Sequence, residues 1–281
     1  MKRSDGRPID SLDPFSKIIP YIMEQRNDAQ NMSKQVVMAQ PILDYVKEKR
    51  SQGHELSVMH YFVALYVRLL ALRPQLNRMV IGKKIYARKG IYLSMALKRD
   101  LTDEGEETTV KFSFEGTESI FQIVDIMKKG MDEAYEEQHN QADHLAHTIM
   151  NLPSFIIGSV VWVLKKLDTW NMLPQSIIEA SPFHTSMFFT YLKSIRLDYI
   201  YHHLYNFGTT GIFVALGKEK WMPVVEKEMV VAKKVFEIGY CMDERICDGM
   251  YFSNSMKLLL RLMAEPALLE DSLDAIMEDW L

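Results

Sequence analysis

Apolar and polar positions follow helical periods in some stretches of the chain and strand periods in others. Residues 58–72 are apolar on most faces and lie between Ser57, a helix-capping residue, and Pro74, which predicts a helix in the centre of a domain. Residues 119–138 place apolar side chains on one helical stripe, with glutamates opposite. Residues 108–114 alternate in the manner of a half-buried strand. Helices and strands interleaved in this way predict a mixed α/β domain.

Shorter patterns, together with proline and glycine positions, predict the other elements. We expect helices at 41–50, 142–151 and 155–170, and strands at 35–40, 83–88, 91–98, 181–190, 201–206, 211–217 and 229–241, the last broken at Lys233-Lys234. Residues 1–20 are polar and contain three prolines. They are therefore predicted to form an extended arm that lies on another surface, rather than a packed element.

The last predicted strand runs into a dense group of charged residues, Asp243-Glu244-Arg245-Ile246-Cys247-Asp248-Gly249. Asp248-Gly249 then opens a helix whose apolar positions share one face. Charged groups at the end of a buried strand need partners, because burying an unpaired charge is costly. From the residues alone, a structural salt bridge at a strand-to-helix turn is the simpler interpretation.

Composition narrows the function classes. The 281 residues are 48% apolar, enough for a core in one large domain or two small ones. A net charge of −4 and a pI near 6.1 argue against a general nucleic-acid binder, which would carry a basic face. Two cysteines, Cys241 and Cys247, indicate a reduced, cytoplasmic protein. We expect no signal peptide, and the most apolar run, residues 155–164, is too short to span a bilayer, which takes ~20 residues.

Three neighbouring histidines raise the question of a metal site. His144 and His147 have the i, i+3 spacing of one helix face, and His139 lies close in sequence. A metal would require further ligands and a supporting outer shell. We therefore expect solvated or hydrogen-bonded histidines, and no metal.

The charged turn resembles the Asp-His-Arg-x-x-Asp-Gly signature of the acyltransferase core components of 2-oxo acid dehydrogenase complexes, whose wider form, His-x-x-x-Asp-Gly, is shared with chloramphenicol acetyltransferase. Every motif position matches except that of the catalytic histidine, which is Glu244 here. Residues 71–77, Ala-Leu-Arg-Pro-Gln-Leu-Asn, look like the helix end Leu-x-x-x-Pro-x-Leu-Asn of the same family. The resemblance extends over residues 20–270 and is greatest to stand-alone bacterial proteins.

The resemblance implies a two-layer α/β sandwich of the chloramphenicol acetyltransferase-like type, with a mixed sheet and flanking helices. It implies one domain over residues 21–281, without a lipoyl domain. Family members generally form homotrimers with the active site between subunits, and coenzyme A enters through a channel. The aspartate of Asp-Gly pairs with an arginine, which assigns that pair to Asp248 and Arg245. A hydroxyl steadies the oxyanion, and its position falls near Tyr191, with Thr190 and Ser194 as neighbours.

The catalytic base is the position that departs from the family. Histidine suits proton removal from a thiol or hydroxyl because its pKa lies near neutral pH. A glutamate is a weak base there, since its unperturbed pKa is ~4.3. Burial in an apolar channel would make it stronger, whereas the neighbouring Arg245 would favour its ionised form. His202 and His203 are the local alternative; on a strand only one of them faces a given pocket, and we take His203 as the candidate.

Three hypotheses follow. The first is a coenzyme A-dependent acyltransferase that moves an acyl group between a thioester and a thiol or hydroxyl, with weak or lost activity. The second is a trimeric pseudoenzyme that binds without turnover, and the third is a structural subunit. Thiol release from acyl-coenzyme A distinguishes the first two, and coenzyme A binding separates both from the third.

Overall fold

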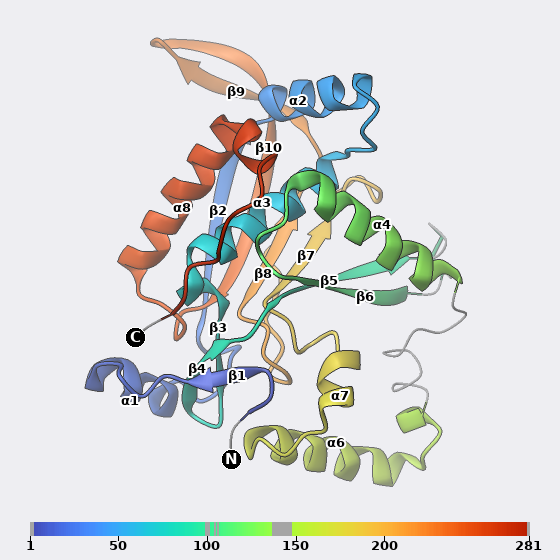
Figure 1. Cartoon of the computed structure of the whole chain (residues 1–281), viewed down its shortest axis with the longest axis vertical. Helices are drawn as coiled ribbons and strands as arrows, with labels where there is room; N and C mark the ends of the chain where they lie inside the picture. Colours follow the sequence, from blue (N-terminus) through green and yellow to red (C-terminus); the bar gives the residue numbers. More distant parts are fainter. Residues whose placement is uncertain (1–2, 99–101, 104, 106, 137–147, 280–281) are drawn as a thin grey trace.

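A computed structural model describes residues 3–98, 102–103, 105, 107–136 and 148–279. Its centre is a seven-stranded mixed sheet with the order β2–β10–β8–β7–β5–β6, in which β9 pairs with β10 (Figure 1). β7 runs parallel to β5 and β8, and the other pairs are antiparallel. In chain order the strands are β2 Gln30–Met38, β5 Ile91–Lys98, β6 Glu107–Phe114, β7 Met187–Tyr191, β8 Ile212–Leu216, β9 Lys220–Glu226 and β10 Met229–Asp243.

Helices form a second layer over one face of this sheet (Figure 1). α3 is central and fully buried along much of its length, with Tyr61 and Phe62 at 0% exposure. Ser57 caps it by accepting from the backbone N–H of His60, as the sequence predicts. The predicted two-layer α/β fold, with a mixed sheet and flanking helices, is confirmed. The helices of this layer are α2 Ala39–Ser51, α3 Val58–Leu72, α4 Ile120–Glu136 and α8 Gly249–Ala264.

The opposite face of the sheet is covered by a loop. Side chains alternate across the strands, so Phe189 packs in the core under the helices while Phe188 and Phe213 pack on the other side. Leu204 lies against Phe188 and Phe213 in this second cluster. The predicted strand at 201–206 is therefore wrong, because this segment lies over the apolar face of the sheet without joining a ladder.

The N-terminal segment is partly packed. β1 (Gly6–Pro8) joins β4 (Lys84–Arg88) and β3 (Arg78–Ile81) in a separate three-stranded sheet. α1 (Pro14–Ile22) follows, with Pro14 in its first turn. Asp13 caps this helix by accepting from the backbone N–H of Ser16. The expectation of an extended arm over residues 1–20 is thus wrong for residues 14–20, where the capping signal outweighs the prolines.

β10 is the longest strand and extends beyond the main sheet. Its second half lies in the sheet, while its first half pairs only with β9 in a projecting hairpin (Figure 1). The predicted break at Lys233-Lys234 does not occur, because both residues pair with β9 and Lys233 forms an ion pair with Glu226. The sequence analysis did not predict β9. The hairpin exposes large apolar side chains, among them Trp221, Val225, Met229 and Val230.

Two helices lie apart from the main helical layer, below it in Figure 1. They are α6 (Ser154–Thr169) and α7 (Gln175–Ala180), and short 3-10 turns occur at Pro74–Asn77 and Pro266–Leu269. The helix expected at 142–151 lies partly outside the described residues. In the described part of the chain, no helix is both long and apolar enough to cross a membrane.

Candidate active site

The charged turn forms one wall of a surface groove. β10 ends at Asp243, and the backbone N–H of Glu244 donates to the carbonyl of Ala29 at 2.9 Å. The Glu244 side chain is exposed and lines a groove of about 390 Å³ between α1 and the start of α8. The Glu244 side chain is therefore not buried in an apolar channel within the single chain. Other lining residues include Phe15, Ile19, Met23, Asn31 and Phe252.

Asp243, directly before Glu244, is the buried anion of the turn. Its side chain is 1% exposed and accepts from Arg245 Nε at 2.8 Å and from Arg245 Nη2 at 2.7 Å. Arg26 Nε lies 3.4 Å from the same carboxylate. Burial lowers the pKa of Arg26, an effect that the charge of Asp243 opposes. Two buried guanidiniums thus share one carboxylate at the end of the strand.

Asp248 has a different role from the one that the resemblance implies. It is exposed, and its Oδ1 accepts from the backbone N–H of Tyr251 at 2.8 Å, which caps α8. The predicted buried ion pair between Asp248 and Arg245 is wrong. The partner of Arg245 is Asp243, two residues before it in the chain. The two carboxylate oxygens of Asp243 accept from Nε and Nη2 of Arg245.

Arg78 connects the turn to the C-terminal segment. Arg78 donates from Nε and Nη2 to the carboxylate of Asp279, at 2.6 and 2.8 Å, and from Nη1 to the carbonyl of Ile246 at 3.3 Å. The C-terminal segment therefore contributes to the shape of the groove. Cys247 lines the groove as well, but burial raises the pKa of its thiol to about 12. A thiol that stays protonated is a poor nucleophile.

The hydroxyl candidates lie far from Glu244 within one chain. Thr190 pairs with Ala215, which in turn pairs with Gly239 on β10. Five residues of strand separate Gly239 from Glu244, roughly 15 Å at the usual rise of a strand. Ser194 is exposed in the turn beyond β7, further from the groove. Neither Thr190 nor Ser194 lines the groove.

The histidine candidate is also displaced from the groove. His203 is exposed in the loop over the sheet and does not line the groove. Its neighbour His202 stacks on Phe213, with ring centroids 3.8 Å apart and planes 6° from parallel. His139, His144 and His147 lie outside the described residues. In the part of the chain that is described, no group of three or more His, Cys, Asp or Glu residues is arranged to hold a metal ion.

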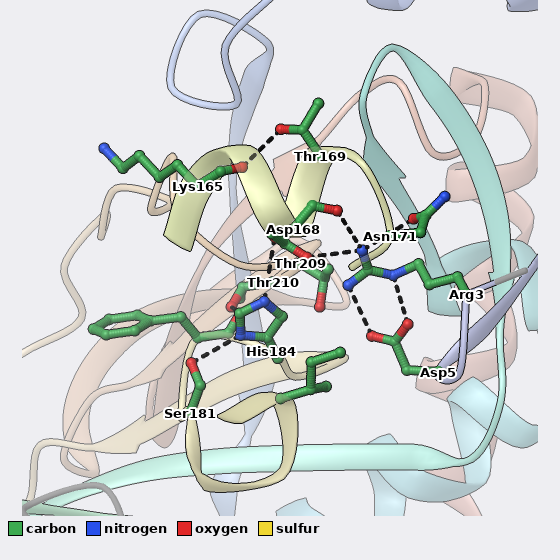
Figure 2. Close-up of polar contacts among 12 residues, drawn as sticks. Arg3, Asp5, Lys165, Asp168, Thr169, Asn171, Ser181, His184, Thr209 and Thr210 are labelled. Atoms are coloured by element: carbon green, nitrogen blue, oxygen red, sulfur yellow. Dashed lines mark hydrogen bonds and ion pairs between the residues drawn. The ribbon is translucent and has the colours of Figure 1, made fainter. Parts of the chain in front are cut away.

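A second polar cluster is buried and does not line the groove (Figure 2). Arg3 contacts Asp5 through Nε at 2.5 Å and through Nη2 at 3.1 Å, and Asp168 through Nη1 at 2.8 Å. His184 lies between Asp168 and Ser181: its Nε2 is 3.3 Å from Asp168 Oδ2 and its Nδ1 is 2.8 Å from Ser181 Oγ. The cluster therefore joins the N-terminal segment, the end of α6 and the loop after α7.

The serine, histidine and aspartate of this cluster stand in the order of a catalytic triad, but all three side chains are buried. Ser181 is 2% exposed and His184 is 1% exposed, so a substrate does not reach the hydroxyl. Burial lowers the pKa of His184, an effect that the hydrogen bond with Asp168 opposes. Burial alone would raise the pKa of Asp168, but the hydrogen bond with His184 and the charge of Arg3 lower it. The sequence analysis missed this cluster, because no spacing relates residues 3, 168 and 184.

Comparisons with known proteins identify the fold. The chain matches no family model and no curated protein sequence. The dihydrolipoamide acetyltransferase of Azotobacter vinelandii is 11% identical, covering 94% of this chain and 98% of its own, with a TM-score of 0.58. A protein from the cubic core of the pyruvate dehydrogenase multienzyme complex is 12% identical, covering 94% and 98%, with a TM-score of 0.57. A chloramphenicol acetyltransferase is 11% identical, covering 92% and 99%, with a TM-score of 0.52.

Proposed function

Because the chain has the fold of the dihydrolipoamide and chloramphenicol acetyltransferases, we propose that it is a coenzyme A-dependent, acyltransferase-like protein with weak or lost transfer activity. The acyl thioester binds in the groove beside Glu244, and the acceptor is a thiol or hydroxyl. The observation that carries this proposal is the position of Glu244, in a groove of about 390 Å³ at the end of the long strand β10.

Motif spacing supports this assignment. The catalytic mechanism of the Azotobacter vinelandii enzyme involves a histidine and an asparagine four positions apart, together with a serine. Glu244 and Asp248 have the same spacing here, on either side of the turn that opens α8. On this assignment Glu244 stands where the general base would act, and Arg245 and Asp248 shape the turn rather than pair with each other.

A neighbouring subunit completes the site in this proposal. Thr190 and Ser194 are too far from Glu244 to act on the same thioester within one chain, so they would serve a second copy's groove. We propose a homotrimer, because structures of this fold include a core of a multienzyme complex and because α1 and the β9–β10 hairpin expose large apolar side chains. Light scattering should give about three times the chain mass of 32.7 kDa. A monomer mass at micromolar concentration would contradict this assembly.

A trimeric pseudoenzyme is the second candidate, and one observation favours it. Glu244 is exposed, and neither Thr190 nor Ser194 lines its groove in the single chain. In this case the groove binds an acyl thioester, or a partner, without turnover. Free cysteines at 241 and 247, both buried, suit a cytoplasmic protein of either kind.

Calorimetric titration with coenzyme A tests the shared part of both candidates. We expect saturable binding by the wild-type chain and weaker binding by Phe252→Glu, which places a negative charge in the groove wall and repels the phosphates of coenzyme A. Lys47→Arg, an exposed change outside the groove, is the control and should bind as wild type does. Absence of coenzyme A binding by the wild-type chain would reject both candidates and leave a structural subunit.

A further inference from the structure

A small cavity lies between the β4–β5 turn, β6, α7 and the N-terminal segment, distinct from the Glu244 groove. Its volume is about 70 Å³, and its lining includes Arg88, Lys111, Tyr92, His184, Asp5 and Glu179. One water needs only ~10–15 Å³ of such cavity volume, so the cavity admits a group larger than a single water. Two cations, Arg88 and Lys111, are the notable features of its wall.

Arg88 is held firmly but is not neutralised. It donates from Nη1 to Thr209 Oγ1 at 2.9 Å and from Nη2 to the Thr209 carbonyl at 2.7 Å. Within the described residues no carboxylate lies within 4.0 Å of its guanidinium, and its buried Nε has no acceptor. Thr209 is itself held, because its backbone N–H donates to the Phe183 carbonyl at 2.8 Å. Burial lowers the pKa of Arg88 to about 10.

Lys111 is the second cation without a carboxylate. Its Nζ donates to the carbonyls of Ile178 and Ser181 at the end of α7, at 2.8 and 3.3 Å, and lies 5.1 Å from the centre of the Tyr92 ring. No carboxylate of the described chain approaches it within ion-pair distance. Burial, together with the charge of Arg88, lowers the pKa of Lys111 to about 7. The two cations are thus close enough to repel each other.

The carboxylates around the cavity are committed elsewhere or face water. Both oxygens of Asp5 contact Arg3, and Asp168 contacts Arg3 and His184. Glu179 is exposed and accepts from Gln175 at 2.7 Å. The lining therefore carries three cations, Arg88, Lys89 and Lys111, against the carboxylates of Asp5 and Glu179. Arg88 and Lys111 are half-buried, and an unpaired charge that is partly removed from water is stabilised by an anion.

We propose that the cavity between Arg88 and Lys111 is a binding site for a phosphoryl group, either inorganic phosphate or a phosphate of a larger ligand. Each contact with Thr209 uses one of the five N–H donors of Arg88, and Lys111 has a third ammonium proton beyond its two carbonyl contacts. Spare donors on two cations around a cavity of this size match a compact anion with several acceptor oxygens. The site does not depend on the acyltransferase proposal, because none of its residues lines the Glu244 groove.

Calorimetric titration of the whole chain with inorganic phosphate, at constant ionic strength set by chloride, tests the site. We expect saturable binding by wild type and a dissociation constant at least ~10-fold weaker in Arg88→Gln and in Lys111→Met. Lys47→Gln removes an exposed charge outside the cavity and should bind as wild type does. If Arg88→Gln fails to fold, as judged by circular dichroism, Lys111→Met decides, because methionine keeps the packing of the lysine stem.

The outcome that overturns the proposal is wild-type binding no stronger than that of chloride, or equal binding by wild type and both cavity variants. Coenzyme A added as a competitor then identifies the source of the phosphoryl group. Displacement of phosphate by coenzyme A assigns the cavity to a phosphate of that molecule, and failure to displace it assigns the cavity to the free ion. Loss of phosphate binding in Arg88→Gln with unchanged coenzyme A binding would separate this site from the groove.

Discussion

Replacing Asp243 should destabilise the protein far more than replacing Asp248, although both belong to the same charged turn. Asp243 is 1% exposed, and its carboxylate contacts Arg245 at 2.7 Å and Arg26 at 3.4 Å. Asp243→Asn preserves the shape but leaves two buried guanidiniums without an anion, and breaking a buried ion pair costs ~3–5 kcal/mol. Asp248→Asn keeps a good capping residue at an exposed position, so the free energy of unfolding should change by less than ~0.5 kcal/mol.

Urea unfolding followed by far-ultraviolet circular dichroism measures both changes. Protein concentration must be kept constant, because subunit association contributes to apparent stability. The slope of the free energy against urea should be the same in all three proteins, so that midpoints compare directly. Equal destabilisation by the two variants, or a larger loss for Asp248→Asn, would refute the assignment of the buried anion to Asp243.

Three further predictions concern acid stability, the hairpin and the C-terminal segment. Burial lowers the folded-state pKa of His184, so its contribution to stability is present above the unfolded pKa of ~6.5 and is lost as the pH falls through the folded value. His184→Gln should therefore reduce the dependence of the free energy of unfolding on pH between pH 7 and 5. An unchanged pH dependence would contradict this. Trp221→Lys, on the exposed hairpin, should lower the apparent mass in light scattering if β9 contacts another subunit, whereas an unchanged mass at every concentration would place the interface elsewhere. Asp279→Asn weakens the ion pair with the buried Arg78 and should cost ~3–5 kcal/mol in urea unfolding; a change under ~0.5 kcal/mol would show that the C-terminal segment does not support the turn.

The elements with strong local signals were predicted accurately. α3 has the predicted bounds, because Ser57 and Pro74 flank an uninterrupted apolar stretch. The start of α8 at Asp248-Gly249 was also predicted from its capping residue. By contrast, residues 201–206 carry strand-like apolar residues whose burial comes from lying on the sheet, and periodicity does not distinguish these two environments.

The sequence predicted which turn forms the candidate site, but not the contacts of its side chains. The motif identified the turn correctly. The prediction that Asp248 binds Arg245 was wrong because Asp243 and Asp248 are both close to Arg245 in sequence, and only the structure shows that Asp243 is the partner. The hydroxyl candidates from the resemblance, Thr190 on β7 and Ser194 in the turn after it, do not line the groove within one chain. The buried cluster around His184 was not predicted for a related reason, because Arg3, which joins it through Asp168, is 165 residues from Asp168 in sequence.

The most direct test of the proposed function is acyl transfer from acetyl-coenzyme A to a small thiol by wild type, Glu244→His and Glu244→Gln. The account predicts weak or no turnover in wild type. It predicts a gain in Glu244→His of up to the ~10²–10⁴-fold that a positioned general base contributes, and none in Glu244→Gln. No turnover in Glu244→His, together with no coenzyme A binding by any of the three proteins, would contradict the claim that this groove is an acyl-thioester site.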